Sequence, residues 1–394
     1  MSVVLVVNSG SSSFKYQLIE MDGERVLASG LVERIGEAAG HAEHKVAGES
    51  FEVERPIPNH TAGFRLMLDA FAGHGPSLTE HAPVAVGHRV VHGGKRFFEP
   101  TVVTDLVKIN IEDLADLAPL HNPANLEGIE AAQKAFPGVP HVAVFDTAFH
   151  HTIPAAASTY AIPAELAEKH RVRRYGFHGT SHKFVSEAAA AYLGRRRSDL
   201  KTIVLHLGNG ASACAVDGGV SVETSMGMTP LEGLVMGTRS GDLDPAVVFH
   251  LARKAGLSID ELDTLLNRRS GLLGLTGRGD MRDVQEAAEA GDERARAGLE
   301  VYYHRLRHYI GAYYAQLGRV DAIVFTAGVG ENVPAVRAGA LRGLEGLGIE
   351  LDPERNTARD RGPRRISTDD SRVAVLVIPT NEELEIARQS LSVV

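Results

Sequence analysis

The chain has 394 residues, of which 44% are hydrophobic and 23% are charged, a composition typical of a soluble globular protein with two or three domains. The formal charge of −9, without a basic tail or a lysine and arginine stripe, argues against nucleic acid as the main partner and gives no sign of binding to a membrane surface. We read the arginine runs at 171–174 and 195–197 as solvated faces.

The compartment follows from what the sequence lacks. The single cysteine, Cys214 in the run ASACAV, cannot form an internal disulfide and reads as a small buried residue without a catalytic role. The opening VVLVV lacks the charged start and the length of a signal peptide, and no apolar run approaches the roughly 18 residues that span a membrane. We therefore expect a cytoplasmic protein.

The N-terminal segment reads as two strands joined by a loop of small residues. An apolar run at 3–7 is followed by NSGSSS, and the next segment alternates apolar and polar residues from Phe14 to Leu18, which is the period of a strand. Walker A and dinucleotide-binding loops open a helix, so this loop is neither of them. A plain hairpin turn remains the alternative to a phosphate-binding loop.

The next elements alternate between strand and helix. The apolar runs at 84–91 and 142–147 predict strands. Between them, the segment 123–136 predicts a helix, with Asn122 as its N-cap and Pro123 at its first position.

The order of parts at the N-terminus returns near residue 200. KTIVLHL, the loop GNGAS, ACAV, the turn DGG and VSVETS repeat the sequence strand, small-residue loop, strand, glycine turn, strand. The glycine loop matches G-x-G-x-x-G/A, but a strand follows it instead of the helix that a dinucleotide site needs. We interpret the repeat as an internal duplication with one copy in each domain.

The C-terminal half is mostly helical. Long helices are expected over 246–266 and 284–317, and a strand at 321–328 leads through the glycine loop GVGEN into another helix. The strand at 373–380 leads into the last helix, where Thr380 and Glu383 have capping-box spacing. The charged stretch 354–365 reads as a surface loop.

These elements predict an α/β protein of two duplicated domains, with the ligand in a cleft between them. The expected N-terminal domain covers 1–149 together with the C-terminal helix 382–394. The second domain covers 150–381.

Several polar residues stand where strands begin or end. Arg89 lies in a strand pattern, and its planar fork suits a carboxylate or a phosphate, although an edge-strand surface arginine is an equal alternative. Asp146 ends a predicted strand at the edge where α/β sheets bind ligands. Arg239 is flanked by small residues that let a ligand approach, whereas Asp242 and Asp244 read as turn residues.

Three histidines stand near predicted turns. His121 precedes a helix start, where it could donate to an anion or be a hydrogen-bonded structural residue. His178 and His182 lie four residues apart in a glycine-flanked turn, and a metal site built on this pair would need further ligands. The three small-residue loops, near Asn8, at 206–210 and at 328–332, could offer backbone N–H groups to phosphates.

Eight motifs together resemble the acetate kinase (acetokinase) family, in order and from end to end. They are VLVVNSGSSSFK, APLHNPAN, VAVFDTAFHHTIP, RRYGFHGTSH, VLHLGNGASACAV, MGTRSGDLDP, AGVGEN and IPTNEELEIA. The resemblance implies the duplicated fold of the actin, Hsp70 and sugar-kinase (ribonuclease H-like) superfamily and a homodimer. It also implies reversible transfer of the ATP γ-phosphoryl group to acetate, giving acetyl phosphate and ADP, with Mg²⁺, for which Mn²⁺ can substitute.

By similarity to this family, Asn8 and Glu382 would hold the metal and Lys15 would reach the nucleotide phosphates. Glu382 is preferred over Glu383 because the latter has the capping-box position. Arg89 would bind the acetate carboxylate. Arg239 and His178 would stabilise the transferring group, with help from His121.

The resemblance implies that Asp146 is an acid/base or positioning residue, and we favour positioning, or an indirect hold on magnesium, because acetate is already ionised at neutral pH. By the same resemblance, the methyl pocket would be formed by Val91, Leu120, Phe177 and Pro230, each of which could equally be ordinary core. The resemblance also implies further nucleotide-binding positions at His206, Leu207, Gly208, Asn209, Gly210, Asp280, Met281, Arg282, Gly328, Val329, Gly330, Glu331 and Asn332.

One departure from the family concerns the loop Gly277–Asp280, which is a residue shorter than usual and makes the nucleotide preference less certain. Two alternatives remain open at this stage. The first is a propionate or short-chain acyl kinase. The second is a non-catalytic ATP-binding sensor, which would not need Arg89, His178 and Arg239 together.

Overall fold

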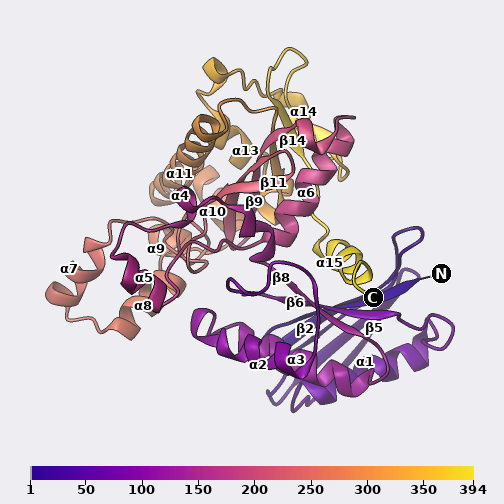
Figure 1. Cartoon of the computed structure of the whole chain (residues 1–394). Helices are drawn as coiled ribbons and strands as arrows, with labels where there is room; N and C mark the ends of the chain where they lie inside the picture. The colour runs from indigo at the N-terminus through magenta and orange to yellow at the C-terminus, as the bar shows by residue number, and fades with distance from the viewer. Residues whose placement is uncertain (1) are drawn as a thin grey trace. The chain divides into compact units, whose positions relative to one another are not determined.

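The computed structural model describes residues 2–394 and divides them into two units (Figure 1). Unit 1 comprises residues 2–148 and Asn381–Val394, and unit 2 comprises Phe149–Thr380. The last helix of the chain thus belongs to the same unit as the first strand.

Unit 1 is built on an eight-stranded sheet in the order β5-β4-β3-β2-β1-β6-β8-β7. Strands β1 to β5 form an antiparallel meander, and β6 and β8 continue the sheet parallel to β1. The strands are β1 (Val3–Ser9), β2 (Ser13–Glu20), β3 (Arg25–Glu33), β4 (Gly40–Val46), β5 (Glu49–Arg55), β6 (Ala85–Val90), β7 (Thr101–Val102) and β8 (His141–Phe145).

Unit 2 repeats this arrangement in a six-stranded sheet, β11-β10-β9-β12-β14-β13. Its meander β9-β10-β11 is antiparallel, and β12 and β14 run parallel to β9. The order β3-β2-β1-β6-β8 therefore corresponds to β11-β10-β9-β12-β14, as the predicted duplication requires. The strands are β9 (Lys201–Leu207), β10 (Ala211–Asp217), β11 (Val220–Thr224), β12 (Ala322–Thr326), β13 (Arg364–Arg365) and β14 (Ala374–Val377).

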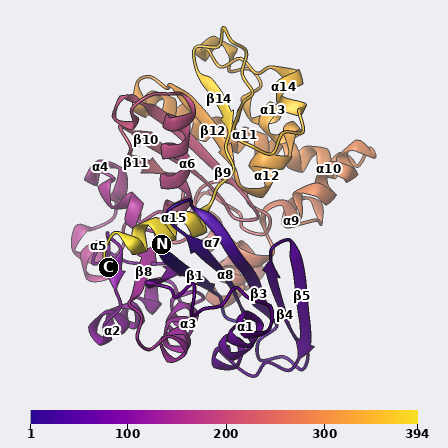
Figure 2. The same cartoon turned by 90° about the vertical axis from the view of Figure 1, so that its right-hand side faces the viewer.

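Helices cover both faces of the first sheet, as Figures 1 and 2 show. The helices of unit 1 are α1 (His60–His74), α2 (Asp105–Asp113), α3 (Asn122–Ala135) and α15 (Glu382–Leu391). Helix α1 contributes Phe64 to the core, where it stacks on Phe14 of β2 with ring centroids 4.5 Å apart. Helix α15 contacts β1, β6 and β8. It lies so close that a Cβ on Gly87 of β6 would stand 2.4 Å from the Ser390 hydroxyl, so a larger residue there would displace the helix.

Unit 2 buries its sheet between α6, which contacts β9 and β12, and α11, which contacts β9 and β10. Cys214 of β10 lies fully buried in this core, where burial raises its pKa to about 12. The helices of unit 2 are α4 (Ala155–Ser158), α5 (Ala164–Lys169), α6 (Gly179–Tyr192), α7 (Ala246–Ala255), α8 (Ile259–Arg268), α9 (Gly271–Thr276), α10 (Met281–Glu289), α11 (Glu293–Leu317), α12 (Ala327–Asn332), α13 (Pro334–Leu341) and α14 (Pro353–Thr357).

Two predicted N-caps are wrong by one residue. Helix α3 begins at Asn122 with His121 as N-cap, because the Asn122 amide is used elsewhere: it bonds both the N–H and the carbonyl of His92. Helix α15 has Asn381 as its N-cap, whose side chain accepts from Leu384 N–H at 3.0 Å. The hydroxyl of Thr380 instead bonds Ser181 at 2.8 Å, so the capping-box reason for preferring Glu382 over Glu383 does not hold.

Other predicted boundaries also differ. The stretch 246–266 is divided into α7 and α8 at Gly256, which has a left-handed φ of 69°, and 284–317 is divided into α10 and α11 at Asp292, the N-cap of α11. GVGEN is not a loop but the body of α12, which starts directly after β12. The stretch 354–365 is not all loop, since it holds most of α14 and the short strand β13.

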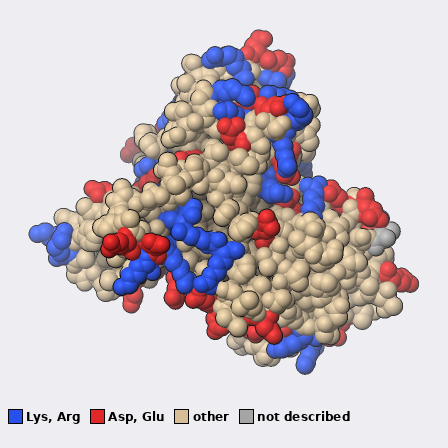
Figure 3. Space-filling view, in the orientation of Figure 1, with Lys and Arg blue, Asp and Glu red and all other residues tan. Residues whose placement is uncertain are grey.

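No helix within residues 2–394 combines the length and the apolar character needed to cross a membrane. Charged side chains of both signs share the face shown in Figure 3.

Candidate active site

Three polar residues gather at the carboxyl edge of the central parallel strands of unit 1. Asn8 stands near the end of β1, Arg89 near the end of β6, and Asp146 directly after β8. The parallel register pairs Val7 of β1 with His88 of β6. The next residues, Asn8 and Arg89, therefore stand at the same level of the two neighbouring strands. Strands that are far apart in the sequence therefore bring these side chains to one sheet edge, where α/β proteins bind ligands.

Arg89 and Asp146 form a two-pronged ion pair. The Arg89 Nε lies 3.0 Å from Asp146 Oδ1, and Nη2 lies 2.7 Å from Oδ2. Burial alone would lower the pKa of Arg89, but the carboxylates of Asp146 and Glu382 raise it above its ordinary value. Because β6 lies between β1 and β8, Arg89 is on an interior strand, which removes the edge-strand interpretation.

Two side chains with oxygen donors, those of Glu382 and Asn8, stand at the same sheet edge as this pair. Glu382, the first residue of α15, places Oε2 3.9 Å from the Arg89 Nε, and Asn8 is partly exposed at the same edge. Lys15 pairs with Asn8 across β1 and β2 and is exposed. Within residues 2–394 no group of three or more His, Cys, Asp or Glu side chains could enclose a metal ion. An amide and one carboxylate match Mg²⁺, which commonly takes few protein ligands and completes its shell with water and phosphates.

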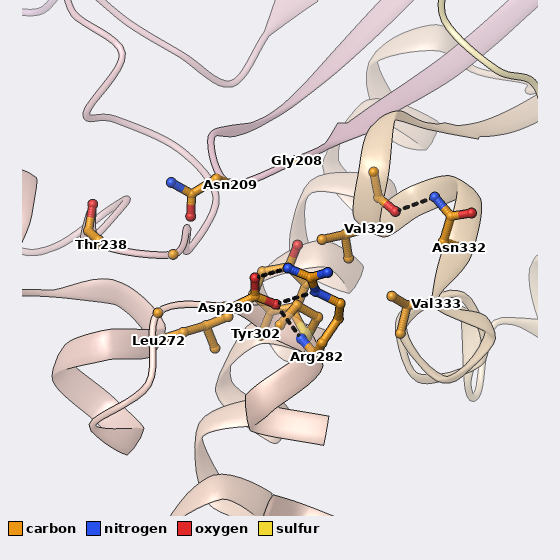
Figure 4. Close-up of a pocket in the computed structure, with 14 residues that line it drawn as sticks. Gly208, Asn209, Thr238, Leu272, Asp280, Arg282, Tyr302, Val329, Asn332 and Val333 are labelled. Atoms are coloured by element: carbon orange, nitrogen blue, oxygen red, sulfur yellow. Dashed lines mark hydrogen bonds and ion pairs between the residues drawn. The ribbon is translucent and has the colours of Figure 1, made fainter. Parts of the chain in front are cut away.

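Unit 2 contains a cavity of about 660 Å³ (Figure 4). Its walls come from the loop after β9, the loop before Arg239, helices α9 to α12, and the residue that follows α12. The lining residues are Gly208, Asn209, Gly237, Thr238, Leu272, Gly279, Asp280, Met281, Arg282, Tyr302, Gly328, Val329, Asn332 and Val333.

The polar side chains of this cavity are held by local bonds. Asp280 accepts the backbone N–H of Arg282 at 2.8 Å and its Nη2 at 2.6 Å, and these bonds lower the pKa of Asp280 to about 2. Asn332 donates to the Gly328 carbonyl at 2.9 Å, and Figure 4 shows both sets of bonds. In the shortened loop, Arg278 turns to Asp292, with Nη1 3.0 Å from Oδ2, so the arginine of this loop does not line the cavity.

Eight of the residues predicted to bind the nucleotide line this cavity: Gly208, Asn209, Asp280, Met281, Arg282, Gly328, Val329 and Asn332. Others lie behind the lining. Leu207 and Gly330 are buried, and the Glu331 carboxylate accepts from Ala327 N–H at 2.8 Å and Thr380 N–H at 3.2 Å. Lys15 belongs to unit 1.

Arg239 and His178 meet at the other side of the glycine loop. A Cβ built on Gly210 would lie 3.4 Å from Arg239 Nη2 and 3.7 Å from His178 Cε1. The Arg239 Nη1 donates to the carbonyl of Pro230 at 2.9 Å, and burial lowers the arginine's pKa. No carboxylate within residues 2–394 forms an ion pair with Arg239, so this partly desolvated cation is suited to an anion.

A stacked pair of histidines, of which His206 is buried and His178 half-buried, adjoins this point. The rings of His178 and His206 stack with centroids 4.2 Å apart. The His206 Nδ1 lies 2.8 Å from the Ser181 hydroxyl, which bonds Thr380 in turn. His178 has a left-handed φ of 56° at the N-cap of α6, a conformation that costs a non-glycine residue energy and that often occurs at functional sites.

The remaining predicted residues divide between the units. In unit 1, His121 is exposed at the start of α3, Leu120 is 59% exposed, and Val91 is half-buried. In unit 2, Phe177 is buried and Pro230 is half-buried.

Sequence reasoning missed six residues that line the cavity: Gly237, Thr238, Leu272, Gly279, Tyr302 and Val333. Two signals were available, since Gly237 and Thr238 directly precede Arg239 in MGTRSGD and Gly279 lies in the shortened loop. Leu272 and Tyr302 carry no such signal, because each reads as an ordinary apolar helix position.

Two sequence interpretations are wrong. Arg174 is not on a solvated face, since its Nη2 lies 2.6 Å from Glu232 Oε1 and its Nη1 donates to the carbonyls of Ser225 and Met226. Asp242 does more than stabilise a turn: besides accepting from Gly233 N–H, it accepts the Tyr309 hydroxyl of α11 at 2.7 Å. Both side chains bind segments that are distant in sequence.

Comparisons with known proteins agree with this architecture. The family model described as "Acetokinase family" matches residues 3–388. An acetate kinase from Leifsonia xyli subsp. xyli is 70% identical over 394 residues, which is 100% of this chain and 99% of the relative.

Two solved structures also match along their full length. An acetate kinase from Porphyromonas gingivalis has a TM-score of 0.95 and 42% identity, and a propionate kinase from Francisella tularensis has 0.93 and 41%, each covering 100% of both chains. The predicted fold class is confirmed, and the chain is a kinase rather than a non-catalytic sensor. The chain belongs to the acetokinase family.

Proposed function

We propose that the enzyme transfers the γ-phosphoryl group of ATP to acetate, reversibly, in a single in-line step. An acetate oxygen forms a bond to the γ-phosphorus, the bond from that phosphorus to the bridging oxygen breaks, and ADP leaves. The observation that carries the proposal is the position of Arg239. This partly buried cation forms no ion pair with a carboxylate of residues 2–394, and it lies, with His178, near Gly210. The same glycine loop also lines the cavity of unit 2.

The cavity of unit 2 is the proposed nucleotide site. Leu272, Met281 and Val333 offer an apolar surface to a base, and the glycines leave backbone atoms accessible to a ligand. The proposed role of unit 2 is therefore to bind ATP and ADP.

Arg239 and His178 are the proposed catalytic residues, with His121 as an assistant. Phosphoryl transfer places charge on the three equatorial oxygens of the moving group, and fixed donors that meet this charge lower the barrier. The Arg239 cation is already partly desolvated by the protein, so little solvent has to be reorganised during the reaction.

Arg89 is the proposed site for the acetate carboxylate. Its Nε and Nη2 are bonded to Asp146, which leaves the N–H groups of Nη1 for a substrate. The proposed role of Asp146 is to orient this fork, because both of its oxygens already accept from Arg89.

Asn8 and Glu382 are the proposed magnesium ligands, and Lys15 the proposed phosphate contact. Bound Mg²⁺ would neutralise the charge of the nucleotide phosphates and leave the protein to orient the acid. The donor set fits because it contains one amide and one carboxylate oxygen at a single sheet edge.

A homodimer formed through unit 2 and a cytoplasmic location complete the proposal. Support for the dimer comes from α7, which has no buried residue and leaves Phe249 58% exposed. Apolar side chains exposed along one helix are typical of an interface.

Propionate is the second candidate substrate, since one full-length structural match is a propionate kinase. The residues proposed to contact the methyl group are Val91 and Leu120 of unit 1, and Phe177 and Pro230 of unit 2. One extra methylene changes discrimination by only about 1–3 kcal/mol in such a pocket.

A hydroxamate assay for acyl phosphate tests both substrates. Purified enzyme with Mg²⁺ and ATP is given acetate, propionate and butyrate separately. The highest kcat/KM is expected with acetate, a lower value with propionate, and the lowest with butyrate. A higher value with propionate would reverse the substrate assignment.

A further inference from the structure

Behind His178 lies a short chain of buried hydrogen bonds. His182 follows His178 by one turn of α6, and Ser212 of β10 stands between the two rings. The Ser212 hydroxyl is 2.9 Å from His178 Nδ1 and 2.7 Å from His182 Nε2. His182 and Ser212 are both completely buried.

This arrangement couples the tautomers of the two rings. A serine hydroxyl has one proton, so it can donate to only one ring nitrogen and must accept an N–H from the other. A neutral imidazole has a single N–H. In the first arrangement His182 Nε2–H donates to Ser212, and Ser212 donates to His178 Nδ1. In the reverse arrangement His178 Nδ1–H donates to Ser212, and Ser212 donates to His182 Nε2.

The surroundings of His182 favour the first direction. Its Nδ1 is buried and has no hydrogen-bond partner within residues 2–394. With the proton on Nε2, this Nδ1 is a bare lone pair near the positive N-terminal end of α6. In the reverse direction it would carry a buried N–H with no acceptor, close to that same positive end, which is the less favourable arrangement. Burial and the neighbouring His150 and His206 keep the pKa of His182 well below its usual range, so the ring is neutral.

We propose that His182, acting through Ser212, is a positioning residue that keeps His178 in the tautomer with its proton on Nε2. The Nδ1 of His178 is then an acceptor, and the ring presents its Nε2–H as a donor. His178 Cε1, the ring carbon between the two nitrogens, lies 3.7 Å from a Cβ built on Gly210, and Arg239 Nη2 lies 3.4 Å from the same point. The inference rests on the proposed role of His178 and identifies which ring nitrogen would donate to the transferring phosphoryl group.

The test compares Ser212→Ala with Ser221→Ala. Ser221 is equally buried, and its hydroxyl also bonds a buried histidine, His150 Nδ1 at 2.8 Å. The other nitrogen of His150 bonds the Phe177 carbonyl at 2.9 Å, so the Ser221 bond to His150 is separate from the Ser212 bond to His178. Ser212→Ala is expected to lower kcat for acetyl phosphate formation by about tenfold or more while KM for ATP changes less than about twofold. Ser221→Ala is expected to keep kcat within about threefold of the wild type.

The tautomer is read directly by ¹⁵N–¹H NMR of histidine-labelled enzyme, with the His178 signals assigned from His178→Gln. Wild type should show His178 protonated at Nε2, and Ser212→Ala should show a mixture of both tautomers. Ser212→Thr, which retains the hydroxyl, should recover most of kcat, and it serves as the second variant if Ser212→Ala does not fold.

Three results separate the possible failures. A wild-type His178 protonated at Nδ1 would overturn the inference, as would a Ser212→Ala enzyme with unchanged kcat and tautomer. If His178→Gln itself retained wild-type turnover, the proposed catalytic role of His178 would fail instead.

Discussion

Asp146→Asn should lower kcat/KM for acetate by weakening the bonds that hold Arg89. The carboxylate is 1% exposed and accepts from Arg89 Nε at 3.0 Å and from Nη2 at 2.7 Å. An asparagine can accept one of these bonds but turns an N–H₂ group toward the other donor. Removing one partner of a buried ion pair costs about 3–5 kcal/mol. Because the Arg89 side chain is 22% exposed, we take the lower end, about 3 kcal/mol, which corresponds to about a hundredfold in kcat/KM.

A double-mutant cycle with Arg89→Met isolates this coupling. The kcat/KM for acetate is measured for the wild type, both single variants and the double variant, and thermal unfolding of each protein controls for folding. We expect Asp146→Asn to cost about a hundredfold in the wild-type background and less than about threefold in the Arg89→Met background. An equal loss in both backgrounds would refute the reasoning, since Asp146 would then act independently as an acid/base or at the metal.

Three further predictions concern stability. The hydroxyls of Tyr302 and Tyr313 on α11 are buried and have no hydrogen-bond partner in the described part of the chain, residues 2–394. Because an unpaired buried polar group costs about 1–3 kcal/mol, Tyr302→Phe and Tyr313→Phe should each raise Tm by about 1–4 °C for a chain of 394 residues. A fall in the calorimetric Tm would contradict this. Burial lowers the pKa of His150 from 6.5 to about 4, so the unfolded chain binds a proton that the folded protein does not. The contribution of neutral His150 to the free energy of unfolding should therefore be fully present above about pH 6.5 and be lost, by about 3 kcal/mol, as the pH drops to about 4. Urea unfolding at several pH values should show a smaller dependence of this free energy on pH in His150→Gln than in the wild type. An equal dependence in both proteins would exclude His150 as its source. Arg337 is 1% exposed and donates to Asn356 and to the carbonyls of Gly330 and Glu331. Arg337→Met should therefore lower the free energy of unfolding by about 2–4 kcal/mol, because these acceptors lose their donor. Arg342→Met, whose ion pair is exposed, should lower it by about 1 kcal/mol or less, and equal losses of the two variants in chemical unfolding would contradict this difference.

The strand order of both meanders could be predicted from local sequence patterns. Alternation from Phe14 to Leu18 and the repeated order of strand, small-residue loop and strand depend only on neighbouring residues, and both appear in the structure. The boundaries of α3 and α15 could not be read this way. Asn122 is used by His92, 30 residues away, and Thr380 by Ser181, 199 residues away, so tertiary contacts decide which residue caps each helix.

The candidate site shows the same division. Arg89 was recognisable as a cation that needs a partner, but its bond to Asp146 joins residues 57 positions apart and depends on β6 lying beside β8. The chain from His182 through Ser212 to His178 had no signal in sequence, because Ser212 reads as the last residue of the small-residue loop GNGAS, whereas the structure includes it in β10. Both sets of contacts depend on how strands and helices that are distant in sequence pack beside one another.

The most direct test of the proposed reaction is a single turnover of γ-labelled ATP, with enzyme in excess, acetate and Mg²⁺, in the wild type and Arg239→Ala. We predict that the wild type moves the label into acetyl phosphate. Arg239→Ala should bind ATP with similar affinity but transfer the label at least a hundredfold more slowly. Release of the label as inorganic phosphate without acetyl phosphate, or near-normal transfer by Arg239→Ala, would contradict this mechanism.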